Sequence, residues 1–333
     1  MEQTSKIYVP GHSGLVGSAI VRRLNALGYS NLLLRSHQQL DLTDQREVQQ
    51  FFTAERPEYV FLAAAKVGGI LANDTYPADF FGQNIRIQTS VIHEAYRARV
   101  NRLLFLGSSC IYPKFAPQPI KEEYLLTGPL EETNRAYAVA KIAGIEMCWS
   151  YNQQYGTRFI AAMPTNLYGE GDRYDLQNSH VIPAMIRKFH EAKVTGAGKV
   201  VLWGTGTARR EFLYSDDAAD ACIFLMNLKD NAADAILADK LTHAVINVGC
   251  GEDLTIRELS ELVASVVGFR GEIIFDPSKP DGTPRKLMDI SRLAALGWKP
   301  HISLREGLAI TYRRFLEEHE VAPGPARISA GLV

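Results

Sequence analysis

Short apolar runs alternate with amphipathic segments along the first half of the chain. In the amphipathic segments the apolar positions recur every three to four residues, which is the period of a helix. The runs predict strands at residues 6–9, 32–34, 59–64, 102–106 and 159–163, and the periodic segments predict helices at residues 14–27, 48–54, 84–98 and 134–155. Continuous apolar strands are typical of a parallel sheet covered on both faces. The pattern predicts an α/β fold with a Rossmann-like, doubly wound parallel sheet.

The pattern loosens from about residue 166 onward, where Tyr, Gly, Asn and Pro become frequent. Helices are still predicted at residues 181–192, 215–228 and 255–267. We expect residues 1–165 to form the first domain and residues 166–318 a smaller, partly interleaved C-terminal lobe, some of whose segments return to the first domain. Residues 319–333 are rich in Pro, Gly and Ala and are expected to form a flexible tail.

A glycine-rich turn follows the first predicted strand. Gly11, Gly14 and Gly17 form a G-x-x-G-x-x-G pattern at the predicted junction of strand and helix. In a dinucleotide-binding turn the first glycine allows the tight bend, the second lets the backbone approach a pyrophosphate, and the third lets the helix pack close to the strand. The free N–H groups at the start of the helix suit phosphate. This context predicts a dinucleotide cofactor bound by residues 1–165.

The end of the second predicted strand favours NADP(H). An acidic residue there would bond the ribose diol of NAD, whereas an arginine accommodates a 2′-phosphate. The strand at residues 32–34 is followed by Arg35, with His37 nearby and no acidic residue before Asp41.

A Y-x-x-x-K pair lies inside the helix predicted at residues 134–155. Tyr137 and Lys141 are four residues apart and therefore share one helical face. We expect the Lys141 ammonium, with a bound nicotinamide cation, to lower the pKa of Tyr137 from its usual value of about 10. Ser108 follows the strand at residues 102–106, where a hydroxyl can bond a substrate carbonyl. The three side chains predict carbonyl reduction.

Composition excludes several other classes. The formal net charge of −1 gives no electrostatic basis for binding nucleic acid or a membrane surface. No apolar run approaches the roughly 20 residues that span a bilayer, and no secretory signal is visible at the N-terminus. The four cysteines have no paired spacing for a metal or a redox motif, and free thiols indicate a reducing, cytoplasmic location.

The Ser–Tyr–Lys set and the glycine turn resemble those of the extended short-chain dehydrogenase/reductase family. Further matching segments lie at residues 62–65, 164–169, 210–213 and 247–249, so the resemblance extends to about Phe315. Within that family, residues 64–70, 107–113, 178–183 and 279–286 are similar to the branch that converts GDP-4-keto-6-deoxy-D-mannose to GDP-L-fucose. That resemblance implies epimerisation at C3 and C5 followed by NADPH-dependent reduction at C4.

The resemblance also implies which residues form the site. Catalysis is carried by Ser108, Tyr137 and Lys141, with Cys110 and His180 as acid and base for epimerisation. The cofactor is held by Gly11, Ser13, Gly14, Leu15, Val16, Gly17, Arg35, Asp41, Leu42, Ala64, Ala65, Leu106, Tyr137, Lys141, Pro164, Asn166, Leu167 and His180. The GDP-sugar is held by Ser108, Ser109, Lys188, Trp203, Arg210 and Asp281, with no metal.

Two departures from the branch leave alternatives open. Ser13 stands where an arginine is often found in the glycine turn, which leaves Arg35 as the main group for a 2′-phosphate. The run from Asp172 to Asp175 replaces an expected Asn-Phe-His-Pro, which bears on the identity of the sugar. A reductase or partial epimerase for another GDP-4-keto-deoxy sugar, such as a heptose, is the alternative enzyme. A non-catalytic NADP-binding sensor is disfavoured because the Tyr–Lys pair is intact.

The helix at residues 134–155 also predicts a homodimer. Its apolar positions occupy more than one face, which is more than contact with a sheet requires. They are Val139, Ala140, Ile142, Ala143, Ile145 and Met147.

Overall fold

A parallel six-stranded sheet forms the larger part of the molecule in the computed structural model, which describes residues 1–175, 179–279 and 281–320. Its strands are, in spatial order, β2 (Leu32–Leu33), β1 (Ile7–Tyr8), β3 (Tyr59–Leu62), β4 (Arg102–Leu106), β5 (Phe159–Pro164) and β9 (Val245–Val248). The strand order reverses between β1 and β3, and ligands bind beyond the carboxyl ends of parallel strands at such a point. The predicted α/β fold is confirmed.

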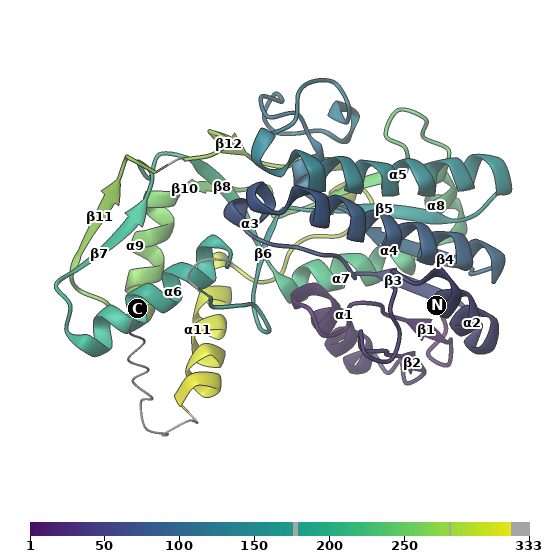
Figure 1. Cartoon of the computed structure of the whole chain (residues 1–333), viewed down its shortest axis with the longest axis horizontal. Coiled ribbons are helices and arrows are strands. Elements are labelled where there is room, and N and C mark those ends of the chain that lie inside the picture. The colour runs from purple at the N-terminus through teal and green to yellow at the C-terminus, as the bar shows by residue number, and fades with distance from the viewer. Residues whose placement is uncertain (176–178, 280, 321–333) are drawn as a thin grey trace, which may run out of the picture.

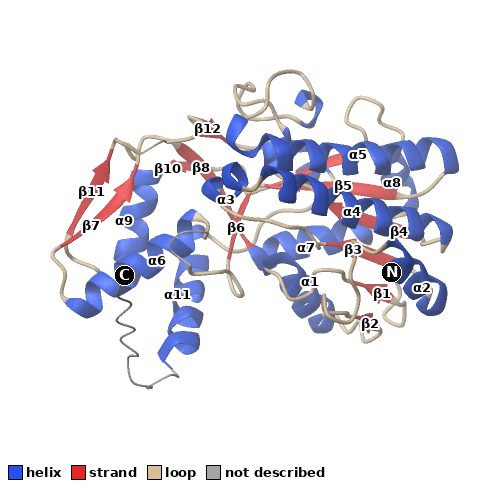
Figure 2. Cartoon of the chain, in the orientation of Figure 1, coloured by secondary structure: helices blue, strands red, loops and turns tan. Residues whose placement is uncertain are grey.

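Helices cover both faces of this sheet (Figure 1 and Figure 2). One face packs against α2 (Gln45–Glu55), α4 (Pro77–Arg97) and α5 (Arg135–Tyr155), and the other against α1 (Leu15–Ala26), α7 (Ser215–Met226) and α8 (Asp230–Leu237). Successive strand residues serve opposite cores: Leu103 and Phe105 point to the first layer, Leu104 and Leu106 to the second. This double burial explains why the strands are apolar without alternation.

The structure moves some predicted boundaries. β3 ends at Leu62, before the predicted residue 64; the Ala63 amide still donates to the Pro10 carbonyl at 3.1 Å but also makes a local turn contact with the Phe61 carbonyl at 2.9 Å. The α4 helix begins at Pro77, seven residues before the predicted start at 84, since proline is well suited to the first helical turn. A short helix, α3 (Ile70–Thr75), precedes it. The α5 helix ends where Gly156 adopts a left-handed conformation, with φ of 67°.

The second lobe is built around two small sheets and three helices (Figure 1). One sheet holds β6 (Asn166–Tyr168), β8 (Arg209–Tyr214), β10 (Asp253–Thr255) and β12 (Arg285–Lys286), and the other holds β7 (Lys199–Trp203) and β11 (Glu272–Asp276). The helices are α6 (Val181–Thr195), α9 (Ile256–Val267) and α11 (Leu304–Glu320). The short α10 (Ser291–Ala295) comes between the last two in sequence but packs against β9 of the large sheet through Leu293. The three helices of the second lobe differ from it in this respect. Their apolar faces meet in a separate core that includes Phe189, Leu259 and Leu308.

The chain passes between the two parts more than once. After β8 it forms α7 and α8 and then β9, which pairs with β5 at the edge of the large sheet. The division at residue 165 remains our interpretation of where the parts meet. Residues 319 and 320, which were expected to begin the tail, belong to α11, and residues 321–333 lie outside the described residues. Within the described part of the chain, no helix combines the length and apolar character that crossing a bilayer requires.

Candidate active site

The glycine turn forms a phosphate cradle at the carboxyl end of β1. Gly11 has a φ of +86°, and a side chain on it would come within 2.6 Å of the Ala64 amide nitrogen. A Cβ on Gly17 would lie 2.0 Å from the Gly11 carbonyl oxygen. Neither position can therefore accept another residue. The absence of side chains at Gly11 and Gly17 lets the start of α1 lie close to the segment that follows β3, which includes Ala65.

The start of α1 has free amide donors. Gly14 is its N-cap, no side chain caps the helix, and Leu15 and Val16 occupy the first turn, whose N–H groups have no partner within a helix. Gly14 and Ser13 are exposed, so a ligand can reach them. This combination suits a pyrophosphate, and the residues present therefore fit a dinucleotide.

Arg35 is paired within the chain. Its guanidinium donates to Glu55 at 2.7 Å and to the Leu34 carbonyl at 3.0 Å, and it lies 5.6 Å from the centre of the Phe51 ring. A 2′-phosphate would therefore compete with the Glu55 carboxylate. The sequence analysis missed Glu55 because it lies 20 residues away at the end of α2.

Asp41 is a local turn residue. Its carboxylate accepts hydrogen bonds from the Thr43 amide and hydroxyl, both at 2.8 Å, and these bonds lower its pKa. Leu42 next to it packs against the core of the first layer. Both remain candidates for contact with the cofactor's adenosine part.

Ser108, Cys110 and Tyr137 come together beyond the carboxyl end of β4. Cys110 lies on a short 3-10 helix, η1 (Ser109–Ile111), whose N-cap is Ser108, and the Cys110 amide donates to the Ser108 hydroxyl at 3.5 Å. A hydrogen bond with Ser108 lowers the pKa of Tyr137, but burial raises it further, well above its usual value. Lys141 is not among the groups that shift the Tyr137 pKa in the protein without cofactor, and the lowering expected from Lys141 together with bound nicotinamide stays a prediction. The phenol stays protonated and acts as a hydrogen-bond donor.

Lys141 lies one turn after Tyr137 on α5 and on the same face of that helix. Its ammonium group donates to the Leu106 carbonyl at 2.7 Å and lies 5.8 Å from the centre of the Tyr137 ring. Burial lowers the pKa of Lys141 to about 8, and the nearby Cys110 opposes that shift. Lys141 therefore links the last strand residue of β4 to the catalytic face of α5, and its proton can be exchanged near neutral pH.

Cys110 is an enclosed thiol. It is 8% exposed, and burial raises its pKa, while the Ser108 hydrogen bond and the cations Lys286 and Lys141 lower it. The thiol lines a narrow cavity that also includes Ser109, Asn134 and Lys286. Asn134 has a buried side-chain oxygen without a hydrogen-bond partner among the described residues. Lys286 was not among the expected site residues, although it ends a segment that matched the family.

His180 lies on a different element from this group. It is the N-cap of α6, its side chain is 51% exposed, and its Nδ1 lies 3.8 Å from Asp172 Oδ1. The Asp172 side chain is only 6% exposed, and its Oδ2 has no hydrogen-bond partner among the described residues. His180 is thus accessible to a ligand and faces a buried carboxylate. Asn178, in the same motif, lies outside the described residues.

The remaining predicted cofactor residues lie where β5 passes into β6. Pro164 ends β5, and Asn166 and Leu167 form β6. The Asn166 side chain donates to the Glu211 carbonyl at 2.8 Å. Glu211 is fully buried, and its carboxylate accepts from the amides of Cys250, Gly251 and Met288 at 2.6 to 2.9 Å. The sequence analysis gave Glu211 no role, but it ties β8 to both parts of the molecule.

Trp203, Arg210 and Asp281 all lie in the second lobe, where Arg210 contacts Asp281. Trp203 ends β7 with 58% of its surface exposed, so it is not a core residue. Arg210 donates to the Asp281 carbonyl at 3.3 Å. The Asp281 carboxylate, predicted to accept sugar hydroxyls, already accepts from the Thr205 amide at 2.7 Å and hydroxyl at 2.8 Å. Asp281 therefore closes the loop after β7, which its position in a Pro-Asp-Gly turn did not indicate.

Lys188 lies on α6, beside the strand that carries Trp203. Its ammonium group donates to the Val201 carbonyl at 3.2 Å, and burial lowers its pKa. No carboxylate within the described ranges is paired with it. Lys188, Trp203 and Arg210 therefore present two cations and a flat apolar ring, which suits a nucleoside diphosphate. Across the described residues, no cluster of His, Cys, Asp and Glu could hold a metal ion.

The chain is similar to enzymes of nucleotide-sugar metabolism over nearly its whole length. The model of the NAD dependent epimerase/dehydratase family matches residues 7–249. The chain is 59% identical over 317 residues to a putative GDP-L-fucose synthase 2 of Arabidopsis thaliana, covering 95% of this chain and 93% of that protein. It is 55% identical over 315 residues to GDP-L-fucose synthase of Escherichia coli (strain K12), covering 95% of this chain and 98% of that protein.

A solved structure is also similar. It is a GDP-mannoheptose C4 reductase from Campylobacter jejuni with NADP bound, and it shares 42% sequence identity with this chain. The two superpose with a TM-score of 0.85, covering 95% of this chain and 99% of that one.

Proposed function

We propose, for a chain that belongs to the NAD dependent epimerase/dehydratase family, that it converts GDP-4-keto-6-deoxy-D-mannose to GDP-L-fucose with NADP(H) as cofactor. The similarity to named GDP-L-fucose synthases at 55% to 59% identity supports this reaction. The observation that carries it is the placement of Cys110 beside the Ser108–Tyr137–Lys141 group. A reductase needs only Ser108, Tyr137 and Lys141, whereas an epimerase also needs an acid or base such as Cys110.

Epimerisation begins with the loss of a proton next to the ketone. C3 and C5 both flank the C4 carbonyl, which makes their hydrogens acidic. Cys110, as a thiolate, takes one proton, so that a C–H bond breaks, an S–H bond forms and the electron pair moves to the ketone oxygen as an enolate. The protonated Tyr137 and Ser108 donate hydrogen bonds to that oxygen. His180 returns a proton from the opposite face and inverts the carbon.

Reduction follows at the same ketone. The bound NADP(H) supplies the hydride for C4. Tyr137 then gives its proton to the developing alkoxide at C4, and Lys141, with a pKa of about 8, can return a proton to Tyr137. The Leu106 carbonyl, which accepts from Lys141 at 2.7 Å, keeps that ammonium group on the catalytic face of α5.

Incubation with GDP-4-keto-6-deoxy-D-mannose and NADPH in D2O tests the reaction. We expect NADPH oxidation, deuterium at C3 and C5, and a product identified as GDP-L-fucose by NMR. Absence of NADPH oxidation would contradict the reductase function. Oxidation that yields only unepimerised GDP-rhamnose would contradict the roles of Cys110 and His180.

A second candidate is reduction of another GDP-4-keto sugar, such as a heptose. The 42% identity to a GDP-mannoheptose C4 reductase favours it, and so does the run from Asp172 to Asp175 that departs from the GDP-L-fucose branch. A GDP-4-keto-heptose offered in the same assay separates the candidates, because the better substrate has the higher kcat/KM.

Arg35 is proposed to bind the 2′-phosphate of the cofactor. Replacing Arg35 with alanine is expected to raise the KM for NADPH by about 10- to 100-fold, because a hydrogen bond to a charged group contributes about 1.5 to 3 kcal/mol. The KM for NADH should change little. Glu55→Gln is the matched control, since it frees Arg35 and should lower the KM for NADPH. Equal losses with both cofactors would contradict this role.

We also propose that the enzyme is a cytoplasmic homodimer formed through α4 and α5. These helices lie side by side on the outer layer (Figure 1), and Phe81, Val139 and Tyr155 on them are 41%, 38% and 46% exposed. Pairing with the same surface of a second copy would cover these side chains.

Val139→Glu tests the dimer. We expect the native chain to sediment as a dimer at micromolar concentration and the variant to sediment as a monomer, because the interface would bury an unpaired carboxylate. Lys199→Glu, on exposed β7, is a control that should remain dimeric. A native monomer, or a dimer that the Val139 variant leaves intact, would contradict this interface.

A further inference from the structure

Strands β8 and β12 carry four cations in two cross-strand pairs. In their parallel register, Arg285 is opposite Arg209, and Lys286 is opposite Arg210. Successive side chains of a strand point to opposite faces of the sheet. Arg209 and Arg285 therefore share one face, and Arg210 and Lys286 share the other. Like charges placed opposite each other repel, so each pair needs an anion.

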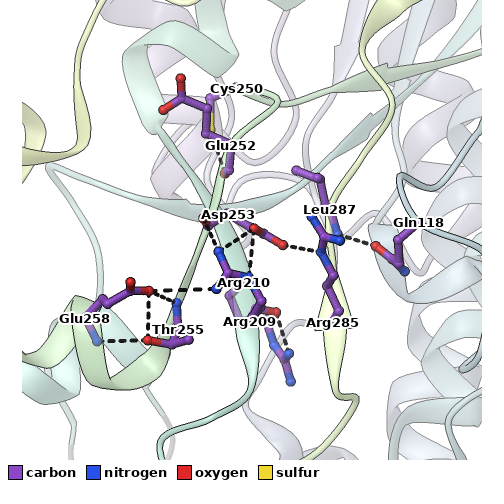
Figure 3. Close-up of polar contacts among 10 residues, drawn as sticks. All are labelled: Gln118, Arg209, Arg210, Cys250, Glu252, Asp253, Thr255, Glu258, Arg285 and Leu287. Carbon is purple, nitrogen blue, oxygen red and sulfur yellow. Dashed lines mark hydrogen bonds and ion pairs between the residues drawn. The ribbon is translucent and has the colours of Figure 1, made fainter.

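Asp253 on β10 supplies that anion for the first pair only. Its side chain is 5% exposed and accepts from Arg209 Nε and Nη2 at 3.0 and 2.9 Å and from Arg285 Nε at 2.5 Å. Figure 3 shows the Asp253 carboxylate between the two guanidinium groups, with the chain of β12 held next to β8. This face of the sheet is neutralised within the protein.

Among the described residues, no carboxylate bridges the second pair in this way. Arg210 donates to the carbonyl oxygens of Arg209 and Asp281, and Lys286 has no hydrogen-bond or ion-pair partner in the described part of the chain. The Glu131 carboxylate, which lines the same cavity and raises the pKa of Lys286, is paired with Lys114 at 2.8 Å. Burial and the neighbouring Arg210 lower the pKa of Lys286. A cation in this position is costly unless an anion forms beside it.

Cys110 is the group that can become this anion. It lines the same narrow cavity as Lys286. The other cation near the thiol, Lys141, is already held by the Leu106 carbonyl. The Ser108 and Tyr137 hydroxyls, which also interact with Cys110, are neutral.

We propose that Lys286 is a positioning residue for epimerisation, whose ammonium group, set beside Cys110 by the β8–β12 register, favours ionisation of the Cys110 thiol against the effect of burial. The Cys110 proton passes to solvent, and the thiolate is then ready to accept a proton from the sugar carbon. Asp253 contributes by neutralising the far face, so that β12 stays in register despite the four cations. The inference rests on the proposed role of Cys110 as a base.

Alkylation of Cys110 by iodoacetamide in the protein without substrate tests the proposal. The rate is measured from pH 6 to 10, and peptide mass spectrometry separates Cys110 from Cys148, Cys222 and Cys250. In Lys286→Met the midpoint of the pH–rate curve should rise by about one pH unit, because an adjacent cation shifts a pKa by about that much. The rate at neutral pH should fall about threefold, since the smaller thiolate fraction is partly offset by higher nucleophilicity.

Two further variants keep the test decisive. Lys286→Arg should restore the native midpoint, and Lys199→Met, which removes an exposed charge on β7, should leave it unchanged. NADPH binding reports whether each variant is folded, and Lys286→Gln replaces the Met variant if that one is not. A native midpoint in a folded neutral variant would overturn the proposal. This readout needs no turnover, so it is independent of whether the proposed reaction is correct.

Discussion

Replacing Tyr137 with phenylalanine is expected to lower kcat for NADPH oxidation by about 10²- to 10⁴-fold, the range that a positioned general acid contributes. The phenol is protonated, because burial raises its pKa, and it is hydrogen-bonded with Ser108. The variant loses both the hydrogen bond to the enolate and the proton for the C4 alkoxide. Initial rates at saturating substrate and NADPH measure this effect.

Tyr155→Phe on the same helix is the control for the Tyr137 variant. Tyr155 is exposed at the end of α5, so its loss of a hydroxyl should change kcat by less than about twofold. The dissociation constant for NADPH should remain similar in both variants. A Tyr137 variant that keeps more than a tenth of the native kcat would contradict the assignment of Tyr137 as acid.

Replacing Cys110 with serine is expected to lower the rate of deuterium incorporation at the epimerised carbon by about 10²- to 10⁴-fold. A serine hydroxyl is a much weaker acid than a thiol and is not ionised near neutral pH, so it cannot serve as the base. NADPH binding should change less than twofold, because Cys110 is proposed to act on the sugar and is not among the residues expected to hold the cofactor. Deuterium NMR of the product and fluorescence titration with NADPH measure the two effects.

Cys148→Ser is the matched control for the Cys110 variant. Cys148 is buried on α5 among apolar neighbours, and its pKa is raised by burial, so no catalytic role is expected. Cys148→Ser should lower the free energy of unfolding. It should leave both the rate of deuterium incorporation and the dissociation constant for NADPH unchanged. If Cys110→Ser weakened NADPH binding as strongly as it slowed epimerisation, a general structural role would replace the proposed one.

Features carried by local chain pattern were predictable from the sequence. The β4 strand lies at the predicted residues 102–106, and α5 and α6 begin within one residue of their predicted starts. Apolar runs and helical periodicity report burial directly, so element type followed from them. The roles of Gly11 and Gly17 were also predictable, because only a residue without a side chain fits where the strand turns into the helix.

Features that depend on contacts between distant segments were not predictable. Glu55 accepts a hydrogen bond from Arg35, and Asp281 accepts one from Thr205. Asp253 accepts hydrogen bonds from both Arg209 and Arg285. Each contact joins residues that are 20 to 76 positions apart, and a single sequence contains no signal for such pairs. The raised pKa of Tyr137 in the protein without cofactor was not predictable for the same reason, because the burial that dominates the shift comes from the whole fold.

The sequence by itself determined the α/β architecture, the dinucleotide turn and the Tyr137–Lys141 face, because turn geometry, strand burial and helix period are properties of consecutive residues. The tertiary structure alone decided which charges are already neutralised and which are left for chemistry. Asp253 accepts hydrogen bonds from Arg209 and Arg285, whereas the Lys286 ammonium group, in the cavity that Cys110 also lines, has no hydrogen-bond or ion-pair partner among the described residues. That distinction depends on strand register and on exclusion from water, which exist only once the chain is folded.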